Sequence, residues 1–478
     1  MTDIKKNFSY NIIYQLLILV LPLITAPYIS RVIGTDGIGV YSYTYSIANY
    51  FLLFAMLGTN NYGNRSIAKS KKNKEKLDKT FSSIYAFQLI MSVLIIVLYS
   101  LYVFFLEKKE YKLYAWIQLL LIASSIFDIN WLFFGLEKFK LTIIRNVIIK
   151  LISVALIFIL VKTKEDLELY ILILAASALI SQISLWPFLK KNVKLQKVKG
   201  QDIKVHIKPN LILFIPVIAI SIYNIMDKIM LGRLTNATEL GLYENSEKII
   251  NVPISIISAL GTVMMPRISN LLVSDDEEVA KSYIDKSMTF IIFITIPITL
   301  GIMSISEDFI PIFYGEEFIK AGYLTKILSI TILFKAWANV IRTQYLLPKE
   351  KDKFYVISVL LGALVNFVFN LALIPRLDGL GAIIGTIMAE FIVALYQTYS
   401  VRKELNIKSY LISSVPFIIT GGIMYIIINL LKGFIENKYI LIFTQILVGG
   451  SIYLTLNYKY ILDNINIVLN TKRIREKV

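Results

Sequence analysis

Apolar residues fill the chain in continuous runs, each about as long as the 20 residues that a helix needs to cross a bilayer. The runs do not alternate with polar positions, so the pattern predicts helices rather than strands. We therefore expect an all-α polytopic membrane protein with about fourteen transmembrane helices. Their predicted ranges are 8–29, 40–62, 82–106, 112–134, 143–162, 168–189, 210–233, 244–265, 284–305, 321–343, 355–374, 380–402, 410–432 and 438–460.

The polar segments between the runs are short, and their lysine and arginine content differs between the two sides of the membrane. With the N-terminus placed inside, 34 of the 50 cationic residues fall inside, 11 outside and five within the spans. Because cations concentrate on the cytoplasmic side of membrane proteins, both termini are predicted to be cytoplasmic. The net charge of +17 then faces anionic inner-leaflet lipid, and no nucleic-acid partner is needed to explain it.

The composition excludes several kinds of chemistry. Charged residues make up 17% of the chain, against about 25% in soluble domains, which argues against a soluble fold. The chain has no cysteine, and its one histidine, His206, lies in a polar segment, so Cys- or His-based metal sites are not expected. Neither a P-loop nor a Ser/His pairing stands out, so we predict no catalytic residues and no cofactor.

An internal repeat divides the chain at an offset of 202 positions. Arginine, glycine and tyrosine recur at this offset, as Arg31 with Arg233, Gly39 with Gly241, and Tyr41 with Tyr243. Each set follows a span predicted to run outward, so the pattern predicts two parallel six-helix lobes. The predicted domains are an N-lobe at 1–189, a cytoplasmic linker at 190–209, a C-lobe at 210–402, and an appended helix pair with a basic tail at 403–478.

Four short motifs occur along the chain: Arg31-Val-Ile-Gly-x-x-Gly-x-Gly-x-Tyr-Ser, Asp128-x-x-Trp131-x-x-x-Gly135-Leu-Glu-Lys-Phe139, Asp227-Lys-Ile-Met-Leu-Gly232 and Tyr314-Gly-Glu-Glu-Phe318. In this order and at this spacing they resemble the motifs of polysaccharide repeat-unit flippases (Wzx-like). The resemblance covers essentially the whole chain. It places the chain in the multidrug/oligosaccharidyl-lipid/polysaccharide exporter superfamily.

The resemblance implies two pseudo-symmetric six-helix lobes in a V shape, located in a bacterial cytoplasmic membrane. It also implies that an undecaprenyl-pyrophosphate-linked glycan is moved to the outer leaflet by alternating access, for capsule or O-antigen synthesis. The implied partners are this glycan, membrane lipid, and a polysaccharide polymerase or export machinery. A lipid II flippase or a multidrug extruder of the same fold remains an alternative. A membrane polymerase or glycosyltransferase fits less well, because the longest predicted outer loop, 306–320, is short.

Charged residues within the spans are costly, about 2.5–3.5 kcal/mol each on insertion scales, and are therefore candidates for function. On the inner side Lys335, Asn339 and Arg342 recur at i, i+4 and i+7 and should share one helix face. We expect this face, with Lys150, to bind the pyrophosphate headgroup. Alternatively, Arg342 only extends to the membrane surface, and Lys150 only pairs with Asp128 to fasten two helices.

A carboxylate near the bilayer midplane could carry a coupling ion. Glu390 lies near the middle of its predicted span, and Asp128 lies in the inner half of another. We expect either residue to bind H⁺ or Na⁺ during transport. The alternative is a protonated side chain that only bonds a neighbouring helix.

A second charged group is predicted in the outer half of the membrane. We expect it to form an outer gate, with Lys248 also contacting the headgroup. Its members are Asp227, Lys228, Glu244, Glu247, Lys248, Arg31 and Arg233. A static network of ion pairs, with the two arginines anchored at the membrane surface, is the alternative.

Overall fold

The computed structural model describes residues 2–273 and 276–463, and these residues form helices without a single strand. The predicted all-α class is confirmed. The first half contains α1 (Thr2–Met56), α2 (Thr59–Ser70), α3 (Lys74–Phe105), η1 (Lys109–Tyr111), α4 (Lys112–Phe127), α5 (Asn130–Gly135), α6 (Phe139–Leu160), η2 (Lys164–Asp166), α7 (Leu167–Ile183), α8 (Trp186–Leu189), α9 (Gly200–Lys204) and α10 (Ile207–Leu234). The second half contains α11 (Ala237–Val273), α12 (Glu277–Tyr314), η3 (Glu316–Phe318), α13 (Ile319–Leu328), α14 (Thr331–Ile341), the π-helical turn η4 (Arg342–Leu346), α15 (Asp352–Val401), α16 (Ile407–Leu430), η5 (Leu431–Gly433) and α17 (Lys438–Leu456).

The chain forms two compact units, Met1–Glu244 and Asn245–Val478. In the first unit α10 packs against α1, so a helix assigned from sequence to the second lobe lies with the first. The lobe boundaries at 189 and 210 therefore stay a prediction. The predicted basic tail, from residue 464 onward, lies outside the described residues.

The predicted spans lie largely within helices, and two long helices each hold a pair of them. α1 is broken at Gly34, whose φ of 70° lies in the left-handed region that glycine adopts readily. α15 is broken at Asp378, which has a φ of 50°. Within the described part of the chain, nine helices are long and apolar enough to cross a membrane. The pair α13–α14, bent by 43°, would make a tenth, so a total of fourteen stays a prediction.

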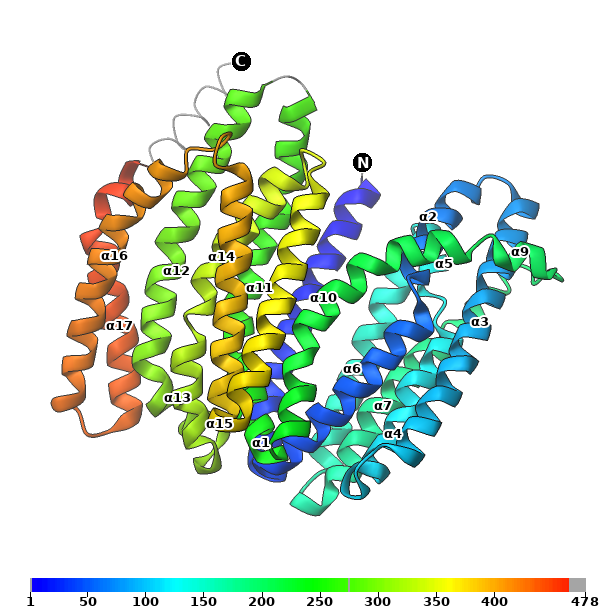
Figure 1. The fold of residues 1–478 in the computed structure, drawn as a ribbon, viewed down its shortest axis with the longest axis horizontal. Helices are drawn as coiled ribbons and strands as arrows, with labels where there is room; N and C mark the ends of the chain where they lie inside the picture. The colour runs from blue at the N-terminus through cyan, green and yellow to red at the C-terminus, as the bar shows by residue number, and fades with distance from the viewer. Residues whose placement is uncertain (1, 274–275, 464–478) are drawn as a thin grey trace. The chain divides into compact units, whose positions relative to one another are not determined.

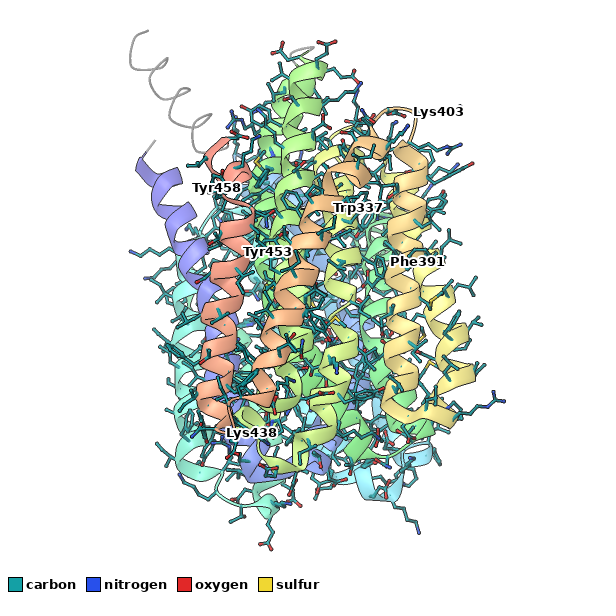
Figure 2. All side chains as sticks on the ribbon, turned by 90° about the vertical axis from the view of Figure 1, so that its left-hand side faces the viewer. Trp337, Phe391, Lys403, Lys438, Tyr453 and Tyr458 are labelled. Carbon is teal, nitrogen blue, oxygen red and sulfur yellow. The ribbon has the colours of Figure 1, made fainter. Side chains whose placement is uncertain are left out.

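Apolar side chains cover much of the outside of these helices. Ile90, Leu94 and Leu98 on α3 are about half exposed, as are Ile418 and Ile446 on α16 and α17. Such surfaces are expected where helices face lipid. In the second unit α16 and α17 lie beside α12 (Figure 1). Lys403 and Lys438 lie toward opposite ends of that unit (Figure 2), as expected for a multi-pass membrane protein.

The two copies of the internal repeat meet within the first unit. A Cβ atom on Gly39 would lie 1.7 Å from the backbone oxygen of Ala237, and one on Gly241 would lie 1.9 Å from that of Thr35. Thr35 and Ala237 are themselves related by the offset of 202. The contact is therefore reciprocal, as expected around a pseudo-two-fold axis, and only glycine permits this backbone approach.

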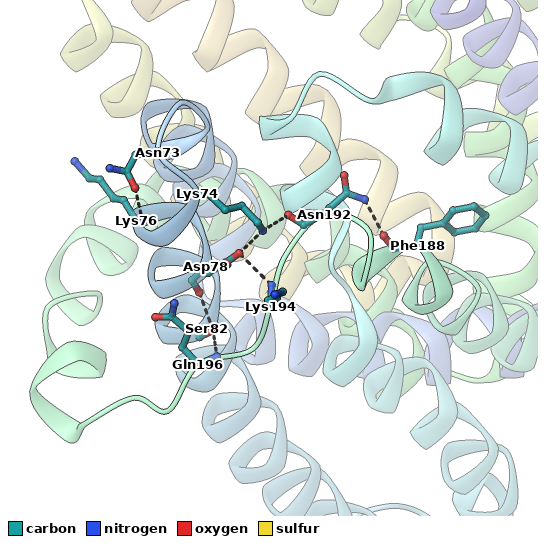
Figure 3. Close-up of polar contacts among 9 residues, drawn as sticks. All are labelled: Asn73, Lys74, Lys76, Asp78, Ser82, Phe188, Asn192, Lys194 and Gln196. Atoms are coloured by element: carbon teal, nitrogen blue, oxygen red, sulfur yellow. Dashed lines mark hydrogen bonds and ion pairs between the residues drawn. The ribbon is translucent and has the colours of Figure 1, made fainter.

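The predicted linker, residues 190–209, is hydrogen-bonded to α3. The Asp78 carboxylate accepts hydrogen bonds from Lys74 Nζ at 2.5 Å and from the backbone N–H of Lys194 at 3.0 Å (Figure 3). Ser82 Oγ accepts another from the N–H of Gln196 at 2.9 Å. These side chains satisfy backbone groups of a segment that has no regular structure.

His206 continues this attachment at the start of α10. Its ring is buried, with Nδ1 2.8 Å from the Tyr62 hydroxyl and Nε2 2.8 Å from Ser83 Oγ. Burial holds the pKa of His206 below its ordinary value, because the charged ring would lose hydration. The histidine is thus a structural residue that ties α10 to α2 and α3.

Candidate functional site

An ion pair lies inside the membrane-spanning part of the second unit. Lys335 Nζ on α14 is 3.2 Å from Glu390 Oε1 on α15. The Glu390 side chain is 5% exposed and that of Lys335 is 22% exposed, so the carboxylate is the more deeply enclosed partner. Two residues assigned from sequence to separate tasks therefore form one charged centre.

The other two members of the predicted stripe on α14 face different neighbours. Asn339 is buried against α11, where a Cβ on Gly261 would lie 2.4 Å from its Oδ1. Arg342 begins the π-helical turn η4, and its guanidinium lies 5.5 Å from the ring centre of Tyr355. Whether Asn339 and Arg342 contact a headgroup stays a prediction.

Asp128 lies at a break between α4 and α5, in the middle of a predicted continuous span. Its Oδ1 accepts hydrogen bonds from the backbone N–H of Asn130 at 2.9 Å and from Asn130 Nδ2 at 2.8 Å. The carboxylate thus satisfies the first backbone N–H of α5, which has no partner within the helix. Gln88 Nε2 donates to the carbonyls of Ser125 at 2.6 Å and Asp128 at 2.8 Å, which satisfies groups freed by the break.

The motif that follows Asp128 serves packing. Trp131 is fully buried, its Nε1 donates to Gln88 Oε1 at 2.8 Å, and its ring fills the space that a Cβ on Gly63 would need. Gly135 lies against Ile67 on α2 in the same way. The Asp-x-x-Trp-x-x-x-Gly spacing therefore builds the α2–α5 contact. A coupling role for Asp128 stays a prediction.

The predicted pairing of Asp128 with Lys150 is not found. Asp128 is hydrogen-bonded to Asn130, while Lys150 lies near the middle of α6. Arg145, in the second turn of α6, is the cation connected to Asp128 instead of Lys150. Arg145 Nη2 donates to Asn130 Oδ1 at 2.9 Å, so Asn130 links Asp128 to Arg145.

A second ion pair lies near the repeat contact in the first unit. Lys228 Nζ is 2.7 Å from Glu244 Oε2, and Ser42 Oγ donates to the same oxygen at 2.8 Å. Asp227 is buried and accepts a hydrogen bond from the Tyr243 hydroxyl at 2.8 Å. Three residues predicted for an outer gate are thus held by two polar contacts in the same unit. Glu247 and Lys248 belong to the second unit, where Lys248 Nζ donates to Asn245 Oδ1 at 3.2 Å.

The two repeat arginines have different surroundings. Arg233 at the end of α10 donates from Nη2 to the Tyr102 hydroxyl at 2.6 Å and lies 3.8 Å from Glu107 Oε1. It therefore fastens α10 to the end of α3. Arg31 is exposed on α1. A gate role for either residue stays a prediction.

The described residues offer no cluster of three His, Cys, Asp or Glu side chains suited to a metal ion. Their chemistry is that of charge pairs within apolar helices, which can exchange partners with a charged ligand or a proton. Arg145, which is 9% exposed, was not selected from the sequence. Its guanidinium donates hydrogen bonds to uncharged acceptors on α5, α6 and α7. The signal was present, since Arg145 is a cation within a strongly apolar segment.

Comparison with known proteins agrees with the fold and the motifs. The sequence profile described as polysaccharide biosynthesis protein matches residues 4–272, and the MatE profile matches residues 213–372. A putative O-antigen transporter of Escherichia coli (strain K12) is 23% identical over 405 residues, which cover 84% of this chain and 97% of that protein. The lipid II flippase MurJ of Bacillus subtilis (strain 168) is 25% identical over 229 residues, covering 45% of this chain and 42% of the relative.

Among solved structures, an inward closed conformation of the lipid II flippase MurJ shares the fold. Its TM-score is 0.76 at 20% sequence identity, with 96% of this chain and 99% of that one covered. The profile match spans more than half of the 478 residues. The resemblance found in the four motifs is thereby confirmed, and the chain belongs to the polysaccharide biosynthesis protein family.

Proposed function

We propose that this protein flips undecaprenyl-pyrophosphate-linked oligosaccharide repeat units across the bacterial cytoplasmic membrane, for synthesis of a capsule or O-antigen type of polysaccharide. Family membership supports a role in polysaccharide synthesis, and the name of the Escherichia coli relative supports transport rather than catalysis. The excess of lysine and arginine in the predicted inside segments supports cytoplasmic termini.

The observation that carries the proposal is the Lys335–Glu390 pair. Charges inside apolar helices are costly to place, and such residues most often lie on ion or substrate paths. An anionic pyrophosphate could replace Glu390 as the partner of Lys335, since ammonium-phosphate contacts are strong charge-assisted bonds. After the headgroup leaves Lys335 on the outside, Glu390 would take up a proton or Na⁺ there and release it on the inside before the next headgroup binds. This exchange would couple outward movement of the headgroup to inward movement of the ion.

The membrane potential favours the proposed direction. A pyrophosphate diester carries about two negative charges, and each gains about 2.3 kcal/mol per 100 mV when it moves outward from an inside-negative compartment. The gain is therefore about 4–5 kcal/mol, without nucleotide hydrolysis. Inward return of H⁺ or Na⁺ would add to it, and rocking of two lobes would provide alternating access.

The test is genetic complementation with two matched pairs of variants. In a strain that lacks its own repeat-unit flippase, Lys335→Met and Glu390→Gln should each abolish surface polysaccharide while the protein stays in the membrane. The control pair is Lys326→Met and Glu307→Gln, which removes a more exposed 3.1 Å ion pair from the same unit. Export by the first pair at the control level would reject the proposed exchange.

A lipid II flippase is the second candidate. The relative from Bacillus subtilis carries that name and matches at 25% identity, although over less than half of this chain. The two candidates separate in one experiment, because only a lipid II flippase would sustain growth when the cell's own lipid II flippase is depleted.

A further inference from the structure

A pocket of about 740 Å³ opens in the first unit where α6 begins and where α7 and α8 end. Its rim carries Lys138, Lys140 and Lys191, all exposed, and its wall includes Ile144, Ile148 and Phe188. A volume of this size is typical of small-molecule sites. Basic groups and apolar side chains thus line one space.

The pocket follows one face of α6. Leu141, Ile144, Arg145 and Ile148 lie at i, i+3, i+4 and i+7, which places them in one row along the helix. Ile144 is 41% exposed and Ile148 is 50% exposed. The apolar row therefore runs away from the basic rim along a helix that is apolar enough to cross the membrane.

Arg145 is oriented at the junction of the basic and apolar parts. Its guanidinium donates to Asn130 Oδ1 at 2.9 Å, to Asn146 Oδ1 at 2.6 Å and to the carbonyl of Ser181. These acceptors carry no net charge, and the contacts hold the side chain in place. Asp128 lies behind Asn130, to which it is hydrogen-bonded.

The remaining charges leave the pocket positive. Glu137 lies on the rim, but its Oε1 is 2.7 Å from Lys71 Nζ, a cation outside the pocket lining. The N-terminus of α6 adds partial positive charge, because Lys138 caps it without a side-chain acceptor. An anion is therefore favoured at the rim, and a hydrocarbon chain is favoured along the wall.

We propose that this space, the α6 pocket, binds an anionic membrane phospholipid, with the phosphate at the lysine rim and an acyl chain along Ile144 and Ile148. The site differs from the Lys335–Glu390 centre, which belongs to the other unit, and goes beyond the proposed transport function. A soluble phosphate would use the rim but not the apolar row. The transported polyprenyl carrier shares the phosphate and the chain, so the test separates it from bilayer lipid.

The test measures lipid binding to the purified full-length protein in neutral detergent. Fluorescent phosphatidylglycerol is titrated against the native protein, with phosphatidylcholine, inorganic phosphate and undecaprenyl phosphate as competitors. Phosphatidylglycerol should bind saturably, and excess phosphatidylcholine or inorganic phosphate should displace little of it. Stronger displacement by undecaprenyl phosphate than by unlabelled phosphatidylglycerol would overturn the proposal in favour of the carrier.

Two sets of variants localise the binding. The pocket variant Lys138→Gln/Lys140→Gln/Lys191→Gln should weaken phosphatidylglycerol binding by about tenfold or more, since charge-assisted contacts to phosphate are lost. The control Lys69→Gln/Lys72→Gln/Lys76→Gln removes the same charge from exposed positions nearby and should change binding less than about twofold. Equal losses in both variants would show surface attraction only and would overturn the proposal.

A third variant tests the apolar part without changing charge. Ile144→Trp places a larger side chain in the pocket at an exposed position, where the fold tolerates it. Binding of phosphatidylglycerol should fall while the thermal unfolding temperature without lipid stays unchanged. Undiminished binding would place the lipid elsewhere.

Discussion

Ser42 and Glu244 occupy the same position in the two copies of the internal repeat, and their side chains share a hydrogen bond of 2.8 Å. The glycines of the repeat, Gly39 and Gly241, make the close approach that allows this bond. Equivalent residues that touch each other lie near a pseudo-two-fold axis. The repeat is therefore an interface within the first unit as well as a record of internal symmetry.

The glycine contact predicts a sharp intolerance to one added methyl group. Gly39→Ala or Gly241→Ala should destabilise the protein by at least about 3 kcal/mol, at the upper end of overpacking costs, because the clash is with backbone. Thermal unfolding of the purified protein measures this. Gly301→Ala and Gly450→Ala are matched controls, since a Cβ there would have no atom within 4 Å beyond its chain neighbours and the backbone of its own helix. Equal stability of all four variants would contradict the contact.

The Lys228–Glu244 pair predicts that the losses of stability caused by removing each partner are not additive. Removing one partner, as in Lys228→Met, leaves a poorly solvated charge and should cost about 3–5 kcal/mol, whereas Lys228→Met/Glu244→Gln should recover most of that loss. Thermal unfolding measures the stability, and polysaccharide export measures the function. A double variant that is stable but inactive supports an outer gate. One that is stable and active supports a static network.

The break between α4 and α5 depends on Gln88. Gln88→Leu would leave two carbonyls and the Trp131 indole N–H without this partner, and should cost on the order of 3 kcal/mol or more. Gln118→Leu is the control, since Gln118 is buried in α4 and its Nε2 has no hydrogen-bond partner in the described structure. That change should be neutral or stabilising. Similar unfolding temperatures for both variants would contradict the role of Gln88.

The buried His206 ring predicts that the attachment of the linker to α2 and α3 weakens at low pH. Because burial lowers the pKa of the folded ring, the neutral form stabilises the fold fully above the unfolded pKa of about 6.5. Stability should then fall as the pH drops from about 6.5 toward the lower pKa of the folded state. Protease cleavage within 190–206 should rise over this range in the native protein. A His206→Gln variant should show a flat profile, and an equal rise in that variant would refute the assignment.

Sequence predicted the helices well because membrane spans are long apolar runs that need no knowledge of distant contacts. The internal repeat could also be recognised from the sequence, through Gly39 and Gly241. The contact between its two copies could not be predicted, since equivalent positions in two repeats need not be neighbours in space. The helix break at Asp128 was not predicted for a local reason: the apolar run hides it, and only the Asp-x-Asn spacing marks it.

The charged centres show a further limit. Lys335 and Glu390 were both selected, because charge within a span is conspicuous in any sequence. Their pairing depends on how α14 and α15 are rotated about their axes, and the apolar pattern of a membrane helix defines that rotation poorly. Arg145 was not selected as a candidate because it lies near the predicted start of a span, where cations normally extend to the surface.

The most direct test of the proposed transport is movement of the substrate itself across a sealed membrane. The purified protein is placed in liposomes with a fluorescent undecaprenyl-pyrophosphate oligosaccharide, and a membrane-impermeant reagent measures how much reaches the outer leaflet with and without an inside-negative potential. The account predicts protein-dependent flipping that the potential accelerates, that Lys335→Met and Glu390→Gln abolish, and that Lys326→Met retains. Flipping that is no faster than in protein-free liposomes, or that Lys335→Met leaves unchanged, would contradict it.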